Sequence, residues 1–182
     1  MVINLPIKER IRECERCPLY EITPQRPVPG VGNGSEAFFV CERLDCVQAT
    51  VEIPFSGDDA DYIKDIIKRA GLNYKNYYYT SLLKCADCDG IYKKKEHLNI
   101  CKDWVFEEIK EKKPKYVFCM GKEVLYRLLP ECKTTWKMKD IIGDKFIHDN
   151  VTYIPIYSLS YLKEYGRGKT QEIAEVISGI LG

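Results

Sequence analysis

Five cysteines in this chain stand at spacings that are typical of metal ligands. Cys14 and Cys17 form one Cys-x-x-Cys pair, Cys85 and Cys88 form another, and Cys101 follows later. Such a pair lets two thiolates reach one metal centre from a single turn of chain, so two further ligands must come from elsewhere. Cys85 with Cys88 would complete a zinc-type pair of pairs, whereas Cys85 with Cys101 would complete a scattered iron-sulfur set. Spacing alone leaves both completions open.

The other four cysteines have no partner at a ligand spacing. Cys41 and Cys119 lie inside the apolar runs AFFVC and YVFCMG, and Cys46 and Cys132 stand alone. We expect all four to be small buried hydrophobic residues. Nine cysteines are many for an intracellular chain of 182 residues, and in a reducing compartment that usage indicates metal more than disulfides.

Composition indicates one globular domain spanning residues 1–182. Hydrophobic residues make up 45% of the chain, charged residues 30%, and the net charge is +1, which argues against a strongly basic chain that seeks polyanions along its whole length. No apolar run approaches the ~18 residues needed to span a membrane, and the charged start has no apolar signal core. We therefore expect a cytoplasmic protein that has no membrane partner.

Hydrophobic periodicity predicts alternating strands and helices that position these residues. The strands are predicted at 37–41, 76–85, 115–121 and 150–157, and the helices at 5–14, 55–71, 93–112 and 123–129, with a last helix capped by Thr170. Four strands alternating with helices predict an α/β fold, a three-layer α/β/α sandwich with a four-stranded parallel sheet. The stretch IPIYSLSYL, residues 154–162, ends the last strand in hydroxyl groups and leads into the charged turn KEYGRGK.

Three motifs together carry a resemblance to a known family. The stretches are CERCPLYEITPQRPVPGVG from Cys14, VCERLDCVQATVEIPFSG from Val40, and TSLLKC ending at Cys85. From Cys14 to about Leu162 the chain resembles family 4 uracil-DNA glycosylases, the iron-sulfur branch of that superfamily. The resemblance implies a uracil-DNA glycosylase-like fold and a 4Fe-4S cluster, and it favours that cluster over zinc. The cluster ligands that it implies are Cys14, Cys17, Cys85 and Cys101, so Cys88 is not expected to be a ligand.

The resemblance also implies which residues form the base pocket. Phe55 matches the aromatic ring that stacks on the base, and Glu42 matches the motif glutamate credited with positioning water. Ser81 stands where the family has an asparagine that reads the pyrimidine edge, and Ser158 stands where it has a histidine that donates to the base oxygen. Plainer interpretations of Phe55 as a core residue and Glu42 as a solvated loop acid stay open.

These replacements predict that uracil chemistry is lost or changed. A serine keeps a hydroxyl but lacks the paired donor and acceptor of an amide, and losing one preorganised donor costs on the order of 10²- to 10³-fold in rate. Neither His97 nor His148 can replace the missing imidazole by position. The first motif loop also gains bulk and charge, through Cys41, Arg43, Leu44 and Asp45, where a backbone should approach the ligand closely.

A basic turn follows the third motif, where the family contacts DNA. Lys163, Arg167 and Lys169 surround two glycines, and cations there would hold phosphates without reading sequence. A solvated charged turn is the plainer interpretation.

Three functions remain open from the sequence. The first is a DNA-binding accessory or structural protein that has lost base excision, with a replication or repair protein as a candidate partner. The second is an active glycosylase of altered base specificity that uses Glu42, Ser81 and Ser158. The third is an iron-sulfur or zinc module unrelated to DNA.

Overall fold

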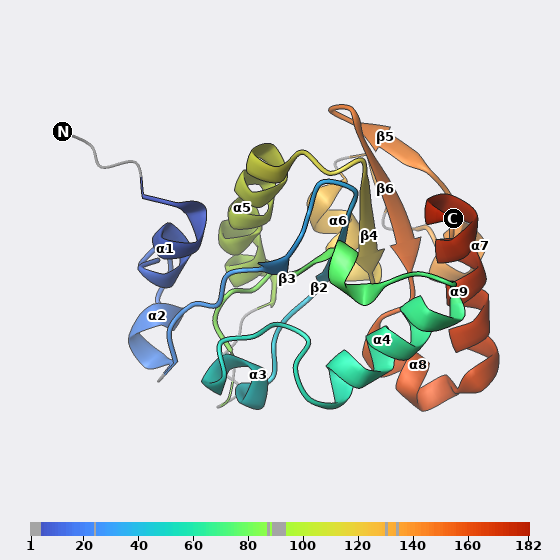
Figure 1. The fold of residues 1–182 in the computed structure, drawn as a ribbon. Coiled ribbons are helices and arrows are strands. Elements are labelled where there is room, and N and C mark those ends of the chain that lie inside the picture. Colours follow the sequence, from blue (N-terminus) through green and yellow to red (C-terminus); the bar gives the residue numbers. More distant parts are fainter. Residues whose placement is uncertain (1–4, 24, 87, 89–93, 130, 134) are drawn as a thin grey trace.

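A mixed six-stranded sheet forms the centre of the molecule (Figure 1). The computed structural model describes residues 5–23, 25–86, 88, 94–129, 131–133 and 135–182. The strand order is β1-β3-β2-β4-β6-β5, with the four inner strands parallel and both edge strands antiparallel to their neighbours. The strands are β1 (Val31–Gly32), β2 (Ala37–Cys41), β3 (Tyr78–Ser81), β4 (Tyr116–Met120), β5 (Phe146–His148) and β6 (Val151–Ile156). The predicted α/β class and four parallel strands are confirmed, but the four-stranded sheet is wrong because two short edge strands extend it.

The inner strands are buried on both faces, as continuous apolar runs predict. Along β2, Phe38 and Val40 face one hydrophobic cluster while Ala37 and Phe39 face another. Phe39 stacks on Phe118 of β4, with 4.7 Å between ring centroids. The sheet therefore separates two apolar cores, and helices must cover both.

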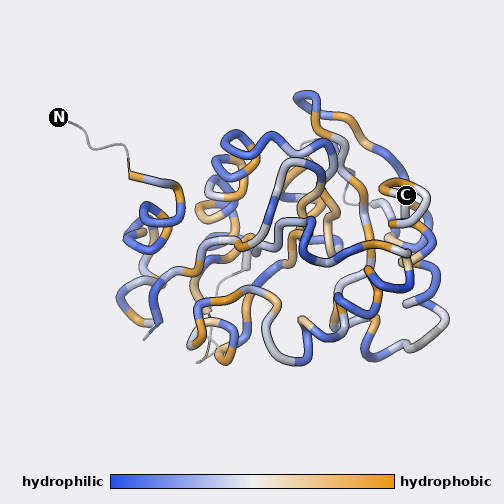
Figure 2. The backbone as a smooth tube through the Cα atoms, in the orientation of Figure 1, coloured by the Kyte–Doolittle hydropathy of each residue, from blue (hydrophilic) through white to orange (hydrophobic). Residues whose placement is uncertain are grey.

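Helices cover the two faces in separate groups (Figure 1). The first core, which contains Phe38 and Val40, is covered by α1 (Ile7–Arg12), α5 (Lys94–Lys112) and α6 (Lys122–Leu128). The second core, which contains Ala37 and Phe39, is covered by α4 (Asp58–Arg69), α8 (Leu159–Tyr165) and α9 (Arg167–Leu181). The connections hold α2 (Leu19–Ile22), α3 (Cys46–Thr50), η1 (Tyr74–Asn76) and α7 (Met138–Ile141). Hydrophobic and hydrophilic residues alternate along the covering helices (Figure 2). None of these helices, within the described residues, combines the length and apolar character needed to cross a membrane.

The segment after β6 is a helix where the sequence predicted a charged turn. Ser158 caps α8, because its Oγ accepts a hydrogen bond from the Tyr161 amide at 3.3 Å. Leu159 and Leu162 bury the inner side of that helix. Thr170 lies inside α9 rather than at its start, and its hydroxyl stands 2.7 Å from that of Tyr62, so its predicted capping role is wrong.

A buried polar network ties α5 to the motif loops. Glu108 of α5 accepts hydrogen bonds from the Gly30 amide, the hydroxyls of Tyr78 and Thr80, and the ammonium group of Lys84. Gly30 has no room for a side chain, since a Cβ there would lie 2.4 Å from the Tyr78 ring. The network fixes the PVPG loop and the end of β3 against the helix that carries Cys101.

Candidate functional site

A cleft of about 890 Å³ opens at the carboxyl ends of β2, β4 and β6. Open α/β sheets bind ligands at this edge, where the strands end and the following loops diverge. The first motif loop forms one wall, and the segments after β4 and β6 form the other. The residues that line it are Cys41, Glu42, Arg43, Leu44, Asp45, Cys46, Asp59, Met120, Gly121, Lys122, Glu123, Ser158, Leu159, Ser160 and Lys163.

Two of the predicted pocket residues meet in this cleft. Glu42 follows β2 and Ser158 follows β6, and both are half-buried in its lining. The Ser158 hydroxyl is engaged locally, because its oxygen caps α8 and stands 3.1 Å from that of Ser160. No histidine is among the residues that line the cleft in the described part of the chain. His97 is buried in α5, and His148 in β5 contacts Glu131 with 3.0 Å between Nδ1 and Oε1.

Two other predicted residues, Ser81 and Phe55, do not line the cleft. Ser81 is fully buried at the end of β3, and its hydroxyl donates to the Leu83 carbonyl at 2.8 Å. Phe55 is 2% exposed and packs edge-on against Tyr79 in the second core. Its φ of 56° lies in the left-handed region, which is uncommon for a residue other than glycine. The position of Phe55 agrees with the plainer interpretation that it is a core residue.

Sequence reasoning missed three of the charged residues that line the cleft, namely Asp59, Lys122 and Glu123. Asp59, in the first turn of α4, accepts a hydrogen bond from Gln48 Nε2 at 2.7 Å and forms an ion pair with Lys163. Lys122 and Glu123 enter the lining at the start of α6. Lys122 was detectable in the sequence, because it directly follows the glycine that ends the third predicted strand, whereas the reach of Asp59 depends on how α4 packs.

The basic turn is divided between two helices. Lys163 belongs to α8 and lines the cleft, and Lys169 of α9 pairs with Glu172 at 2.8 Å. Arg167 begins α9, but its side chain lies outside the described part of the structure. The glutamate partner and the adjacent Tyr157 raise the pKa of Lys169, so this side chain is a stable cation.

A second site, the cysteine pocket, lies beside the core that contains Phe38 and Val40. It is lined by the four cysteines that the resemblance implies as ligands: Cys14, Cys17, Cys85 and Cys101. The first two follow α1, the third follows β3, and the fourth lies on the inner side of α5. Packing of α1 against α5 therefore brings together residues that are far apart in sequence.

Hydrogen-bond donors point at two of these sulfur atoms. The indole Nε1 of Trp104 donates to Cys14 Sγ at 3.1 Å, and the backbone amide of Lys84 donates to Cys101 Sγ at 3.2 Å. Burial, followed by the neighbouring thiols, raises the pKa of Cys85 to about 12. Burial also raises the pKa of Cys101 to about 12. Because thiolates are the metal-binding form, a cation in the pocket is what would hold these groups ionised.

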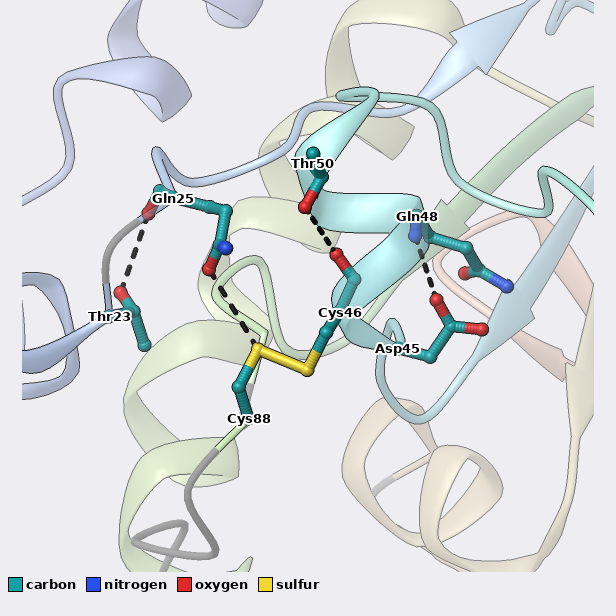
Figure 3. Close-up of a disulfide and its surroundings, with 7 residues drawn as sticks. All are labelled: Thr23, Gln25, Asp45, Cys46, Gln48, Thr50 and Cys88. Atoms are coloured by element: carbon teal, nitrogen blue, oxygen red, sulfur yellow. Dashed lines mark hydrogen bonds between the residues drawn. A yellow bond between two sulfur atoms is a disulfide. The ribbon is translucent and has the colours of Figure 1, made fainter.

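Cys88 is excluded from the pocket by a disulfide with Cys46 (Figure 3). The zinc-type completion through Cys85 and Cys88 is therefore wrong, and so is the expectation that Cys46 is an unpartnered hydrophobic residue. Cys119 is fully buried as expected, whereas Cys41 and Cys132 are half-buried. Across the described residues, no three His, Cys, Asp or Glu side chains are grouped closely enough to hold a single metal ion.

Comparison with known proteins identifies the family of this architecture. The sequence model of the Uracil DNA glycosylase superfamily matches residues 30–178, which include the cleft, β3 and α5. A Type-4 uracil-DNA glycosylase from Archaeoglobus fulgidus is 27% identical over 117 residues, covering 64% of this chain and 58% of that protein. A second, from Pyrobaculum aerophilum, is 22% identical over 116 residues, covering 63% and 59%. The chain thus matches less than two thirds of the length of either relative. Since the family model covers most of the chain, this protein belongs to the uracil DNA glycosylase superfamily.

Proposed function

We propose that this protein binds DNA but no longer excises uracil, and serves as an accessory or structural factor in DNA replication or repair. The observation that carries the proposal is the position of Ser158. Its hydroxyl occupies the cleft where the family resemblance places an imidazole donor, and it is engaged in capping α8. An alcohol cannot carry positive charge near neutral pH, so it stabilises a departing uracil anion far less than an imidazole does.

The positions of Ser81 and Phe55 support the same conclusion. A base held in the cleft would need an aromatic ring to stack on and a polar side chain that hydrogen-bonds to the edge of the base. Both residues that the resemblance assigns to these tasks are buried away from the cleft lining. A uracil-specific pocket would require movement of Ser81 at the end of β3 and of the Phe55 ring, both of which are buried.

We propose that the cysteine pocket holds a 4Fe-4S cluster. The residues present fit such a group, because four thiol ligands share one pocket and two of them receive N–H donors, as thiolates of cluster sites do. When bound, the cluster would supply a covalent link between the end of α1, the end of β3 and α5. An iron and zinc analysis with a visible spectrum distinguishes this cluster from zinc on the same cysteines.

A row of tyrosines beside the cleft supports single-stranded DNA as a ligand. Tyr157, Tyr161 and Tyr165 form a ladder with ring centroids 4.7 and 4.4 Å apart. Tyr165 at its outer end is 58% exposed, and Lys169 Nζ lies 5.3 Å from the Tyr157 ring centroid. Aromatic rings beside cations are what sequence-tolerant binding of unpaired bases uses. The ion pairs of Lys163 and Lys169 are partly exposed, so exchanging their carboxylate partners for phosphates costs little.

A second function keeps some support, namely a glycosylase of altered base specificity. Glu42 and Ser158 do line one cleft, which therefore contains a carboxylate that could position water and a hydroxyl that could contact a base. Family membership argues against the third function, a metal module unrelated to nucleic acid. An intracellular location, close to DNA, follows from the proposal.

DNA binding is tested by fluorescence anisotropy with labelled single-stranded and duplex oligomers over a salt series. We expect affinity to fall steeply with salt, and Lys169→Ala to reduce the salt slope by about one. Tyr165→Ala should weaken single-strand binding by about 1–3 kcal/mol. Lys110→Ala, on the exposed side of α5, is the matched control and should change neither. Absence of binding even at low salt would contradict the proposal.

A further inference from the structure

Figure 3 shows the Cys46–Cys88 disulfide, which joins α3 to the segment that follows Cys85. Cys46 is the first residue of α3 and lines the cleft, while Cys88 lies three positions after Cys85. Their Cα atoms are 5.6 Å apart. One covalent bond therefore connects a wall of the cleft to the stretch of chain that leaves a cysteine-pocket residue.

Few apolar contacts hold α3 in place. Its apolar anchor is Ala49, which shares a small buried cluster with Val28, Leu44 and Ala86. Val47, on the same short helix, is instead 67% exposed. A cluster of this size contributes little burial, so the disulfide and the Gln48–Asp59 hydrogen bond are the other anchors of α3.

The position of α3 is transmitted across the cleft through hydrogen bonds. Asp45 caps α3 by accepting from the Gln48 amide at 2.7 Å, and the side chain of Gln48 donates to Asp59 of α4 at 2.7 Å. Asp59 in turn pairs with Lys163 on the opposite wall. Displacement of α3 would therefore reach the cation that we propose for phosphate binding.

The bridge is accessible to thiol reagents. Cys88 is exposed and Cys46 is half-buried, whereas Cys119 is fully buried. Gln25 Oε1 lies 3.8 Å from Cys88 Sγ (Figure 3). In the disulfide this is only a contact, because the sulfur carries no proton, but a reduced Cys88 thiol could donate to that oxygen. The reduced Cys88 thiol thus has a hydrogen-bond acceptor close by.

We propose that Cys46 and Cys88 form a reversible thiol–disulfide switch that holds α3 as a wall of the cleft when oxidised and releases it when reduced. In the reduction, one thiolate of a dithiol attacks Cys88 Sγ, breaks the S–S bond and releases the Cys46 thiolate, which takes up a proton. The second thiol of the reductant attacks the mixed disulfide, releases Cys88 and leaves as an oxidised disulfide. Two electrons and two protons pass to the protein, and a low-molecular-weight disulfide reverses the exchange.

The consequence for ligand affinity rests on the proposed DNA binding, whereas the switch itself does not. If α3 is already ordered, less conformational entropy is lost when DNA binds. The oxidised form should therefore bind DNA more tightly than the reduced form. The first measurement is therefore made without DNA.

The experiment follows amide hydrogen exchange of residues 45–53 in the 182-residue protein, before and after treatment with dithiothreitol. We expect exchange there to accelerate by roughly tenfold or more on reduction, while the β4 amides are unchanged. Thiol alkylation and mass spectrometry should show Cys46 and Cys88 becoming reactive together. Cys46→Ser/Cys88→Ser should show the fast exchange under both conditions, and Cys132→Ser is the matched control that keeps the redox response.

Three outcomes would overturn the switch. They are an oxidised protein without the Cys46–Cys88 link, unchanged exchange after verified reduction, or a reductant effect that persists in the double serine variant. Far-ultraviolet circular dichroism of the reduced wild-type protein shows whether the fold survives, independently of the variants. If exchange responds but neither redox form binds DNA, the switch stands and the proposed function fails. If DNA binds equally to both forms despite the exchange response, the predicted effect on affinity is wrong.

Discussion

Lys84 and Glu108 form a fully buried ion pair, with 2.8 Å between Nζ and Oε2. Lys84 directly precedes Cys85, and Glu108 lies on the helix that carries Cys101. The pair also binds Thr80 of β3. It therefore fixes the strand end and the long helix in the one arrangement that brings their cysteines into a common pocket.

Breaking this pair should be strongly destabilising. Lys84→Met leaves Glu108 buried without its cation, and removal of one partner of a buried pair costs about 3–5 kcal/mol. Urea unfolding of wild type and variant measures the difference. Arg69→Ala breaks the exposed pair with Asp65 and should cost less than about 1 kcal/mol. Equal losses in the two variants would refute the role given to burial.

Removal of one pocket cysteine should abolish binding of the proposed cluster. Cys101→Ser takes away a buried ligand from α5, so we expect the iron content and the visible absorbance of the purified protein to collapse. Cys132→Ser, which alters a half-buried cysteine outside the pocket, should leave both unchanged. A Cys101→Ser protein that keeps its full complement of iron would show that the pocket is not the cluster site.

The indole of Trp104 should lie close enough to the proposed cluster to affect its reduction potential. Its N–H donates to Cys14 Sγ, and hydrogen bonds to ligand sulfurs stabilise the more negative, reduced state of a cluster. Trp104→Phe keeps a ring under the Arg16 guanidinium, whose carbon lies 3.5 Å from the ring centroid. The reduction potential should therefore fall without loss of iron. Trp136→Phe, at the ring that stacks on Phe146, is the control that leaves the potential unchanged.

The sequence predicts those elements that are defined by residues close together in the chain. The inner strands are recognisable because each is an apolar run bounded by breakers, and α4 is recognisable because acids begin it and Gly71 follows it. The cysteine set Cys14, Cys17, Cys85 and Cys101 was available only through a family resemblance, since spacing left Cys88 as an equal alternative.

The features that sequence analysis missed depend on distant contacts. Cys46 and Cys88 are 42 positions apart, and nothing in either neighbourhood indicates the other. The motif match predicts Phe55 as a ring of the base pocket, but the ring packs against Tyr79 in the core. The KEY segment of the predicted turn is helical because Ser158 caps it and Leu162 buries one side, and these contacts outweigh the charges on its outer surface.

Alkaline pH should destabilise the protein through its buried tyrosines. Burial raises the pKa of Tyr74 to about 12, and it raises the pKa of Tyr78 and Tyr79 further, with Glu108 adding to the effect at Tyr78. Because the folded pKa exceeds the unfolded value of 10.0, the stabilisation is complete below pH 10 and is lost as pH rises through 12.

A spectrophotometric titration checks this expectation. Phenolate absorbance from the buried tyrosines should appear together with the loss of helical circular dichroism. Full ionisation of all 13 tyrosines while the helical signal is intact would contradict the burial argument.

Base excision is the most direct test of the central claim. In a single-turnover assay, the metal-loaded protein in excess is incubated with oligomers that carry uracil, hypoxanthine or xanthine, in single strands and in mismatches. We predict no abasic product, although the same oligomers are bound, and we predict that Ser158→His alone does not restore uracil release because Ser81 and Phe55 remain buried. An abasic product that disappears in Glu42→Gln would contradict the account and establish an active glycosylase.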